Sequence, residues 1–395
     1  MRTTIAILIS LTSLLACSQS EGSRVILGNE KMEEILQQVD GKRVAVVGNH
    51  TSVIQADLVE NPTHLIDTLI SRGVNIVKAF APEHGFRGNK ANGAQIVDGV
   101  DTATGLHIYS LHGKHRKPSD EHLEDVDVVI FDIQDVGARF YTYLSTLLLV
   151  MEAAAENDVN VIVLDRPTPH AHQVQGPMLN PNFSSFVGLA PVPVVHGMTL
   201  GEIALMANGE GWLEGGLKAN LVVINCEGYT HSTKYSLPIA PSPNLPSDQS
   251  IALYPSLCFL EPTAVSIGRG TPTPFEIVGF PGNTQGEFEF TPVPTPGASP
   301  NPKHKNQLCR GDNLSNTQTT WDLKFLVGYA NMFRNDQGNL EGFFTSTSFF
   351  DKLAGTDKLR LSLEEGLSAK EIEAGWVDDI NEFKIARTPY LLYPL

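Results

Sequence analysis

Short runs rich in Val and Ile alternate with helical patterns along the first half of the chain, and this alternation limits the possible folds more than any other feature. The runs lie at residues 42–49, 74–80, 107–111, 126–133, 160–164 and 221–225. Helical patterns lie at residues 29–39, 65–71, 143–157 and 199–208. Strands that are apolar almost throughout are buried on both faces, and parallel neighbours are usually connected by a helix. The order therefore predicts an α/β fold whose parallel sheet is covered by helices on both faces.

A proline-rich stretch at residues 238–246 separates this pattern from the rest of the chain. Its four prolines exclude both a helix and a central strand. We therefore expect a first domain at 24–240 and a second at 241–395, which suits a chain of 395 residues. The second part has Gly- and Pro-rich loops up to residue 302 and helical patterns at 321–333 and 368–380.

The first sixteen residues have the pattern of an export signal, with Arg2 followed by an apolar run too short to span a bilayer. Residues 14–17 resemble the lipobox of bacterial lipoproteins, in which the cysteine is lipidated and begins the mature chain. This similarity implies lipidation of Cys17, with residues 17–23 as a tether. The expected location is outside the cytoplasm, periplasmic or at the cell surface, with acyl chains in the membrane. Plain signal-peptide cleavage is the alternative.

The charge balance and the cysteines exclude several classes of partner and site. A formal net charge of −16 argues against nucleic acid as a partner, because phosphate binding needs clustered cations. Beyond Cys17 the chain has Cys226, Cys258 and Cys309, without the CxxC spacing of zinc or redox sites. At most one internal disulfide can form among these three.

Polar clusters follow four of the expected strands, at residues 48–52, 82–88, 132–139 and 165–167. The carboxyl ends of parallel strands meet at one edge of a sheet, where ligands bind. The clusters carry Asn49, Glu83, His84, Arg87, Asp132, Asp135, Arg139 and Asp165. Capping of a turn or helix explains Asp165. Capping explains residues 82–88 less well, because Glu, His and Arg share one glycine-bounded loop.

The motifs of common enzyme classes are absent from the sequence. There is no GxGxxG after a strand, no Walker loop, no GxSxG and no HExxH, so no cofactor is predicted. His170 and His172, near Asp165, form a weak candidate metal site. The remaining chemistry is that of carboxylates, and glycoside hydrolysis needs one protonated carboxyl group to donate to the leaving oxygen. Glu83, between Phe80 and Phe86, is a candidate for that acid because desolvation raises a carboxyl pKa.

Six motifs together resemble the NamZ-type exo-β-N-acetylmuramidases, a family long known only as a domain of unknown function. They are PEHGFRG at 82–88, DIQDVGARFYTY at 132–143, LDRP at 164–167, HGMTLGE at 196–202, PSPNLPS at 241–247 and GRGT at 268–271. The resemblance implies a Rossmann-like parallel-sheet domain, a smaller α+β C-terminal domain, and an active site in the cleft between them. Family members remove N-acetylmuramic acid from non-reducing ends of peptidoglycan fragments, which implies muropeptides or disaccharides as partners.

The resemblance also suggests roles for individual residues. Glu83 would be the general acid, and we expect Asp132 as the second catalytic group because it lies nearer the strand end than Asp135. An arginine is expected to bind the lactyl carboxylate of the sugar, and Arg87 is the first choice because it shares a loop with Glu83. The full set of expected substrate contacts is Asn49, His84, Arg87, Arg139, Tyr141, Tyr143, His196, Glu261 and Arg269.

Two segments depart from the family pattern. Residues 261–264 read EPTA where family members tend to have EGTN, and the proline-rich segment 291–302 matches no family motif. Two other functions stay open at this point: a non-catalytic peptidoglycan-binding lipoprotein, and a metal-dependent cell-wall hydrolase that uses His84, His170 or His172. The stereochemical outcome, retaining or inverting, is open as well.

Overall fold

The computed structural model describes residues 24–54, 62–83, 85–87, 98–318 and 321–395. Cys17, the whole predicted signal and tether, and His84 lie outside the described residues.

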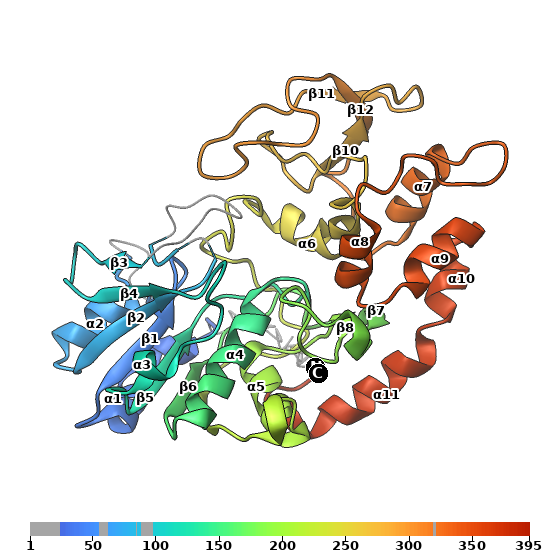
Figure 1. Cartoon of the computed structure of the whole chain (residues 1–395). Helices are drawn as coiled ribbons and strands as arrows, with labels where there is room; N and C mark the ends of the chain where they lie inside the picture. The colour runs from blue at the N-terminus through green and yellow to red at the C-terminus, as the bar shows by residue number, and fades with distance from the viewer. Residues whose placement is uncertain (1–23, 55–61, 84, 88–97, 319–320) are drawn as a thin grey trace, which may run out of the picture.

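The first half of the chain forms a seven-stranded sheet in the order β3-β4-β2-β1-β5-β6-β9 (Figure 1). The strands are β1 (Val44–Gly48), β2 (Ile76–Ala81), β3 (Gly99–Val100), β4 (His107–Ser110), β5 (Val128–Asp132), β6 (Asn160–Leu164) and β9 (Asn220–Ile224). Every pair of neighbours is parallel except β3 and β4. The predicted parallel sheet is therefore confirmed.

Helices cover both faces of this sheet, because successive strand residues point to opposite sides. The helices of this half are α1 (Met32–Val39), α2 (Leu65–Ser71), α3 (Asp120–Leu123), α4 (Tyr143–Glu156) and α5 (Leu200–Glu210). Val44 and Val46 belong to one buried cluster with residues of α1 and α2. Ala45 and Val47 belong to another with residues of α4 and α5. At the start of α5 the Thr199 hydroxyl accepts from the Glu202 amide and so caps the helix.

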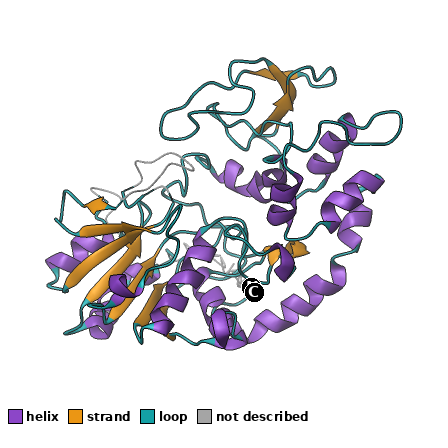
Figure 2. Cartoon of the chain, in the orientation of Figure 1, coloured by secondary structure: helices purple, strands orange, loops and turns teal. Residues whose placement is uncertain are grey.

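The second half is smaller and more irregular, with a three-stranded antiparallel sheet and short helices (Figure 2). Its strands are β10 (Ile277–Phe280), β11 (Phe288–Phe290) and β12 (Cys309–Asn313). Its helices are α6 (Asp248–Leu257), α7 (Lys324–Met332), α8 (Thr347–Ala354), α9 (Lys358–Glu365), α10 (Ala369–Ala374) and α11 (Val377–Arg387). The single helix predicted at 368–380 is wrong, because α10 ends before Gly375 and α11 begins after Trp376.

The two halves share one hydrophobic core. The buried cluster that holds Phe131 of β5 also holds Phe259 and Phe350 of the second half. A two-stranded sheet, β7 (Gln175–Met178) and β8 (Pro193–Val195), lies at the junction beside α11 (Figure 1). This continuity sets the positions of the loops between the halves.

The C-terminal residues pack back onto the first half. The Tyr393 hydroxyl donates to Asp165 Oδ2 at 2.6 Å, and the Thr199 hydroxyl donates to the same oxygen at 2.7 Å. The Gly201 amide donates to Asp165 Oδ1 at 2.9 Å. Asp165 is fully buried in these contacts, in agreement with a structural role.

Cys226, Cys258 and Cys309 are buried and have free thiols. Among the described residues, no helix combines the length and the apolar character needed to cross a bilayer.

Candidate active site

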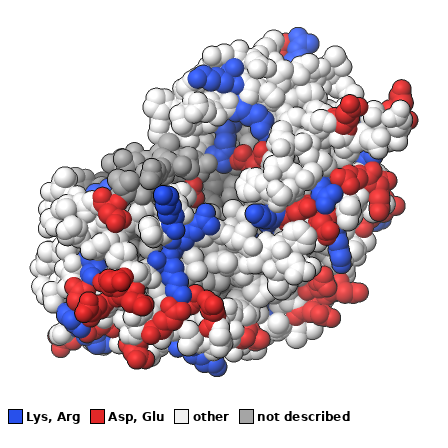
Figure 3. Space-filling view, viewed as in Figure 1, with Lys and Arg blue, Asp and Glu red and all other residues white. Residues whose placement is uncertain are grey.

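A cavity of about 240 Å³ lies between the two halves of the chain. The first half contributes Glu83, after β2, and residues 140–143, before and at the start of α4. The second half contributes residues of the 242–245 segment, of α6 and of the loops that carry Glu261 and Arg269. Figure 3 shows basic and acidic side chains side by side in the hollow between the halves. The cavity therefore lies where the family resemblance implies a cleft.

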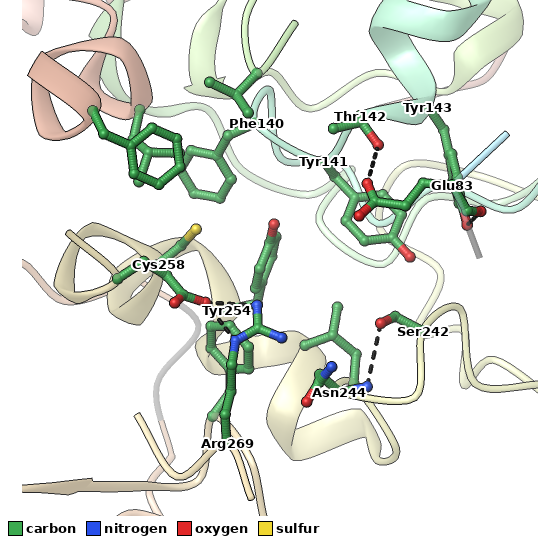
Figure 4. A pocket seen from close by; sticks show the side chains of 16 residues that line it. Glu83, Phe140, Tyr141, Thr142, Tyr143, Ser242, Asn244, Tyr254, Cys258 and Arg269 are labelled. Atoms are coloured by element: carbon green, nitrogen blue, oxygen red, sulfur yellow. Dashed lines mark hydrogen bonds and ion pairs between the residues drawn. The ribbon is translucent and has the colours of Figure 1, made fainter. Parts of the chain in front are cut away.

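Glu83 is held at the cavity by the start of α4. The Thr142 hydroxyl donates to Glu83 Oε2 at 3.0 Å, and the Tyr143 hydroxyl donates to the Glu83 carbonyl oxygen at 3.3 Å. The turn that places Glu83 needs Gly85, whose φ is 79°. Figure 4 shows the carboxyl group beside Thr142 and the Tyr141 ring. The loop after β2 therefore presents a fixed carboxyl group to the cavity.

Tyr141 and Tyr143 belong to the same wall of the cavity as Glu83. Both are buried, and their rings meet edge to face with centroids 4.9 Å apart. The Tyr141 hydroxyl donates to the Pro241 carbonyl oxygen at 2.8 Å, which ties this wall to the second half. Both line the cavity as predicted.

Arg269 and Glu261 form an ion pair in the opposite wall. Arg269 Nε and Nη2 each lie 2.6 Å from Glu261 Oε1. The guanidinium also lies over the Phe275 ring, 5.1 Å from its centroid. Figure 4 shows Arg269 projecting toward the middle of the cavity. The cavity thus has a carboxyl group on one side and a guanidinium on the other.

Asp132, the expected second catalytic group, is in a buried ion pair and does not line the cavity. Arg166 Nε lies 2.6 Å from Asp132 Oδ1, and Asn29 Nδ2 donates to Asp132 Oδ2 at 3.2 Å. The Asp132 side chain is fully buried and that of Arg166 nearly so. Because a buried guanidinium needs this carboxylate as its counter-ion, we assign Asp132 a structural role in place of the expected catalytic one.

Asp135 lies behind the cavity wall. Its Oδ1 accepts from the Gly137 amide at 2.6 Å, and within the described residues its buried Oδ2 has no hydrogen-bond partner. Burial raises the pKa of the Asp135 carboxyl to about 7. Burial raises the pKa of the Tyr141 and Tyr143 hydroxyls, and the nearby Asp135 carboxyl adds to this increase. Asp135 therefore does not line the cavity, and it acts on the cavity through its interaction with these two tyrosines.

Of the three candidate arginines, only Arg269 lines the cavity. Arg87 is bound by two carboxylates: its Nε and Nη2 donate to Asp101 at 2.8 and 2.7 Å, and its Nη1 and Nη2 donate to Asp67 at 3.1 and 3.0 Å. Arg87 in turn lowers the pKa of the Asp101 carboxyl to about 2. The expectation that Arg87 binds the sugar carboxylate is therefore replaced by a role in holding its own loop.

Arg139 is fully buried, and its hydrogen bonds within the described residues go to main-chain carbonyl oxygens. Its Nη1 donates to the carbonyl oxygens of Pro177 and Val192, and its Nη2 to those of Leu353 and Ala354. Burial lowers the pKa of Arg139 to about 9. The structure thus makes Arg139 a connection between the halves, and its predicted contact with substrate is not supported.

The remaining candidates within the described residues do not line the cavity either, although Asn49 is in hydrogen-bonding contact with Tyr143, which does. Asn49 is buried, and its Oδ1 accepts from the amide and the hydroxyl of Thr51. His196 is buried, its Nδ1 accepts from the Met198 amide at 3.2 Å, and burial lowers its pKa to about 3. Both stabilise turns after strands.

Of the histidines proposed for a metal, His170 and His172 lie within the described residues, and these two do not form a site. His170 Nε2 lies 2.9 Å from the Ile251 carbonyl oxygen, and its Nδ1 lies 3.0 Å from Gln173 Nε2. His172 is exposed. Because both ring nitrogens of His170 already have partners, the geometry does not favour a metal there.

Several cavity residues were missed by sequence reasoning. Thr142, Ser242 and Asn244 line the cavity and lie within two of the family-like motifs, at 132–143 and 241–247, so the motifs could have indicated them. Tyr254 and Phe349 line it as well, and no motif marks either one. Their positions depend on helices of the second half.

Comparisons with known proteins agree with this arrangement. The model of "Exo-beta-N-acetylmuramidase NamZ, N-terminal" matches residues 44–249, and that of "Exo-beta-N-acetylmuramidase NamZ, C-terminal" matches residues 252–393. The peptidoglycan beta-N-acetylmuramidase NamZ of Bacillus subtilis (strain 168) is 37% identical over 379 residues, which cover 90% of this chain and 88% of that protein.

Two crystal structures of DUF1343 family proteins from Bacteroides fragilis NCTC 9343 have the same fold. One has a TM-score of 0.84 at 44% identity, and the other a TM-score of 0.80 at 28% identity. Each similarity covers 94% of this chain and 99% of the other chain.

The buried Asp135 carboxyl predicts a measurable pH dependence of stability. Its folded-state pKa of about 7 is above the ordinary 3.8, so its ionisation opposes folding. The contribution of Asp135 to the free energy of unfolding should be fully present below about pH 4 and should decrease as the pH rises toward 7. Asp135→Asn should remove this decrease. The change in the free energy of unfolding from pH 4 to pH 7.5 should therefore be more favourable in the variant than in the wild type by roughly 2–4 kcal/mol.

Urea unfolding at pH 4 and pH 7.5 measures the effect, with Asp40→Asn, at an exposed position, as the control. Equal pH slopes for the wild type and Asp135→Asn would contradict the assignment.

Proposed function

The chain belongs to the NamZ family of exo-β-N-acetylmuramidases, and from this membership and the cavity we propose that it releases N-acetylmuramic acid from non-reducing ends of peptidoglycan fragments. The relative from Bacillus subtilis is a peptidoglycan beta-N-acetylmuramidase. The single observation that carries the proposal is the position of Glu83 across the cavity from Arg269. Glu83 can protonate a glycosidic oxygen, and Arg269 can bind the lactyl carboxylate that distinguishes N-acetylmuramic acid.

Glu83 is the proposed general acid. Cleavage of the glycosidic bond leaves an electron pair on the leaving oxygen, and a carboxylic acid in contact with that oxygen supplies the proton. The Thr142 hydroxyl fixes the orientation of the carboxyl group by its bond to Oε2. A fixed donor needs little rearrangement in the transition state, which is where positioning increases the rate.

Asp135 is proposed as a positioning residue. Neither Asp132 nor Asp135 lines the cavity, and Glu261, which does, is paired with Arg269, so only the proton-donating step is assigned to a carboxyl group here. Asp135 supports the loop that carries Tyr141 by accepting from the Gly137 amide. The tyrosine rings, together with Tyr254 and Phe275, offer the apolar surface on which sugars pack.

Arg269 is the proposed ligand of the lactyl carboxylate. N-acetylmuramic acid differs from N-acetylglucosamine by a lactyl ether, and a guanidinium binds a carboxylate through parallel charge-assisted hydrogen bonds. Glu261 uses one oxygen to hold two nitrogens of Arg269, which fixes the plane of the guanidinium. A sugar without the lactyl carboxylate would lack these hydrogen bonds to Arg269, and so would be a poorer substrate.

Export and lipid anchoring are proposed from the sequence pattern of residues 1–23. Lipidation of Cys17 would place the enzyme at a membrane surface outside the cytoplasm, where peptidoglycan lies. Labelled palmitate should be incorporated into the wild-type protein and not into Cys17→Ser; equal labelling of both would contradict the anchor.

Replacing the proposed acid tests the activity itself. Glu83→Gln keeps the shape of the side chain and removes its proton, so release of N-acetylmuramic acid from a disaccharide should decrease on the order of 100- to 10,000-fold. Glu124→Gln, at an exposed position, serves as the control and should retain full activity.

Two further results would lead to other functions. Binding of the disaccharide without turnover by the wild type would indicate a non-catalytic receptor, and loss of turnover on chelation would indicate a metal enzyme. A Glu83→Gln variant that keeps more than about a tenth of the wild-type rate would exclude Glu83 as the acid.

Arginine substitutions test sugar recognition. Arg269→Met should decrease kcat/KM for the muramide on the order of 100-fold and leave the slow rate on the glucosaminide nearly unchanged. Arg87→Met should alter the two rates by similar factors, because Arg87 is bound by Asp67 and Asp101. Selective loss of the muramide rate in Arg87→Met alone would reverse the assignment.

A further inference from the structure

The proline-rich segment without a family motif, together with the residues that follow it (291–304), lies against the back of the wall that carries Arg269. The Val293 amide donates to the Gly270 carbonyl oxygen at 2.8 Å. Pro302 is so close that a Cβ at Gly270 would lie 2.6 Å from Pro302 Cβ. Asn244, a cavity residue, donates from Nδ2 to the Ala298 carbonyl oxygen at 3.1 Å. The segment therefore contacts two of the three stretches that form this wall.

Lys303 connects the segment to the third stretch, the loop of residues 260–265. Its Nζ donates to the carbonyl oxygens of Leu260 at 3.1 Å, Glu261 at 3.0 Å and Val265 at 2.7 Å, and also to that of Thr263. The neighbouring His304 ring lies 2.6 Å from the Ala264 carbonyl oxygen. This loop is where the sequence reads EPTA, so Lys303 holds the backbone on which Glu261 is mounted.

Lys303 also carries a charge that no near carboxylate neutralises. Within the described residues, no carboxylate oxygen lies within ion-pair distance of its Nζ, whereas Arg269 and Glu261 neutralise each other. The wall formed by Arg269, Glu261 and Lys303 thus has one surplus positive charge. In a poorly hydrated wall such a charge attracts an anion beyond contact distance.

We propose that Lys303 is a positioning residue that determines specificity: through the 260–265 loop it fixes the Glu261–Arg269 pair, and its surplus charge favours a sugar that carries a carboxylate. The proposal rests on the proposed function, because it names what makes that cavity select the muramide. Lys303 acts through Arg269 and does not itself need to touch the sugar.

The charge of Lys303 changes within an accessible pH range. Burial lowers the pKa of Lys303 to about 8, so the ammonium is present below that pH and is lost above it. The groups that face it are Glu261, Arg269 and His304. Burial lowers the pKa of His304, which is therefore neutral from pH 7 to 9, and Arg269, whose pKa is raised, keeps its charge in this range.

The experiment measures the ratio of kcat/KM for the muramide to kcat/KM for the glucosaminide, because proton donation by Glu83 affects both substrates equally. Lys303→Met should decrease this ratio about ten-fold at pH 7, mainly through a higher KM for the muramide. Lys303→Arg, which keeps the charge, should restore most of it. The control is Lys305→Met, at an exposed position two residues further on, and should match the wild type.

The pH profile distinguishes the charge from a purely structural clamp. The wild-type ratio should decrease more between pH 7 and pH 9 than the ratio for Lys303→Met, in which the ionisation of Asp135 behind the opposite wall is the change that remains. Equal loss on both substrates, or a flat wild-type ratio, would overturn the proposal, and the second readout needs no variant that might misfold. Failure of the proposed function would show separately, as absence of muramide hydrolysis by the wild type.

Discussion

The arrangement around the cavity depends on the buried guanidinium of Arg139. It donates to carbonyl oxygens of Pro177 and Val192 from the first half and of Leu353 and Ala354 from the second half. The next residues in the chain, 140–143, form the cavity wall that fixes Glu83. Because Arg139 satisfies four main-chain acceptors without a carboxylate, any shift between the halves would leave buried polar groups unpaired. A rigid junction is therefore built into the wall that carries the proposed acid.

The cavity combines groups of opposite charge at positions fixed by different parts of the fold. Glu83 follows a strand of the parallel sheet and is oriented by the start of α4. Arg269 lies in a loop of the second half and is oriented by Glu261, which Lys303 supports from behind. Because Glu83 and Arg269 are held by different parts of the fold, proton donation and sugar recognition can be changed independently. A comparison of the muramide with the glucosaminide therefore separates the two. The large core shared by the halves fixes the positions of Glu83 and Arg269 relative to each other.

Sequence reasoning predicted the parts that depend on local pattern and failed where distant residues decide. The bounds of α2 follow from a helical pattern, and those of β6 from a run rich in Val and Ile. The motifs also contain Glu83, Tyr141 and Arg269, which the structure brings together at one cavity. Asp132 and Arg87 are different, because their partners Arg166, Asp67 and Asp101 come from other segments of the chain. Lys303 lies in none of the motifs, and its proposed role could not be predicted from sequence because its contacts are with main-chain carbonyl oxygens.

The most direct test of the account is a crystal structure of Glu83→Gln with the disaccharide of N-acetylmuramic acid and N-acetylglucosamine bound. The account predicts the sugar in the cavity, with its lactyl carboxylate on the Arg269 guanidinium and its glycosidic oxygen within hydrogen-bond distance of the side chain at position 83. A sugar bound elsewhere, or a lactyl carboxylate on Arg87, would contradict it.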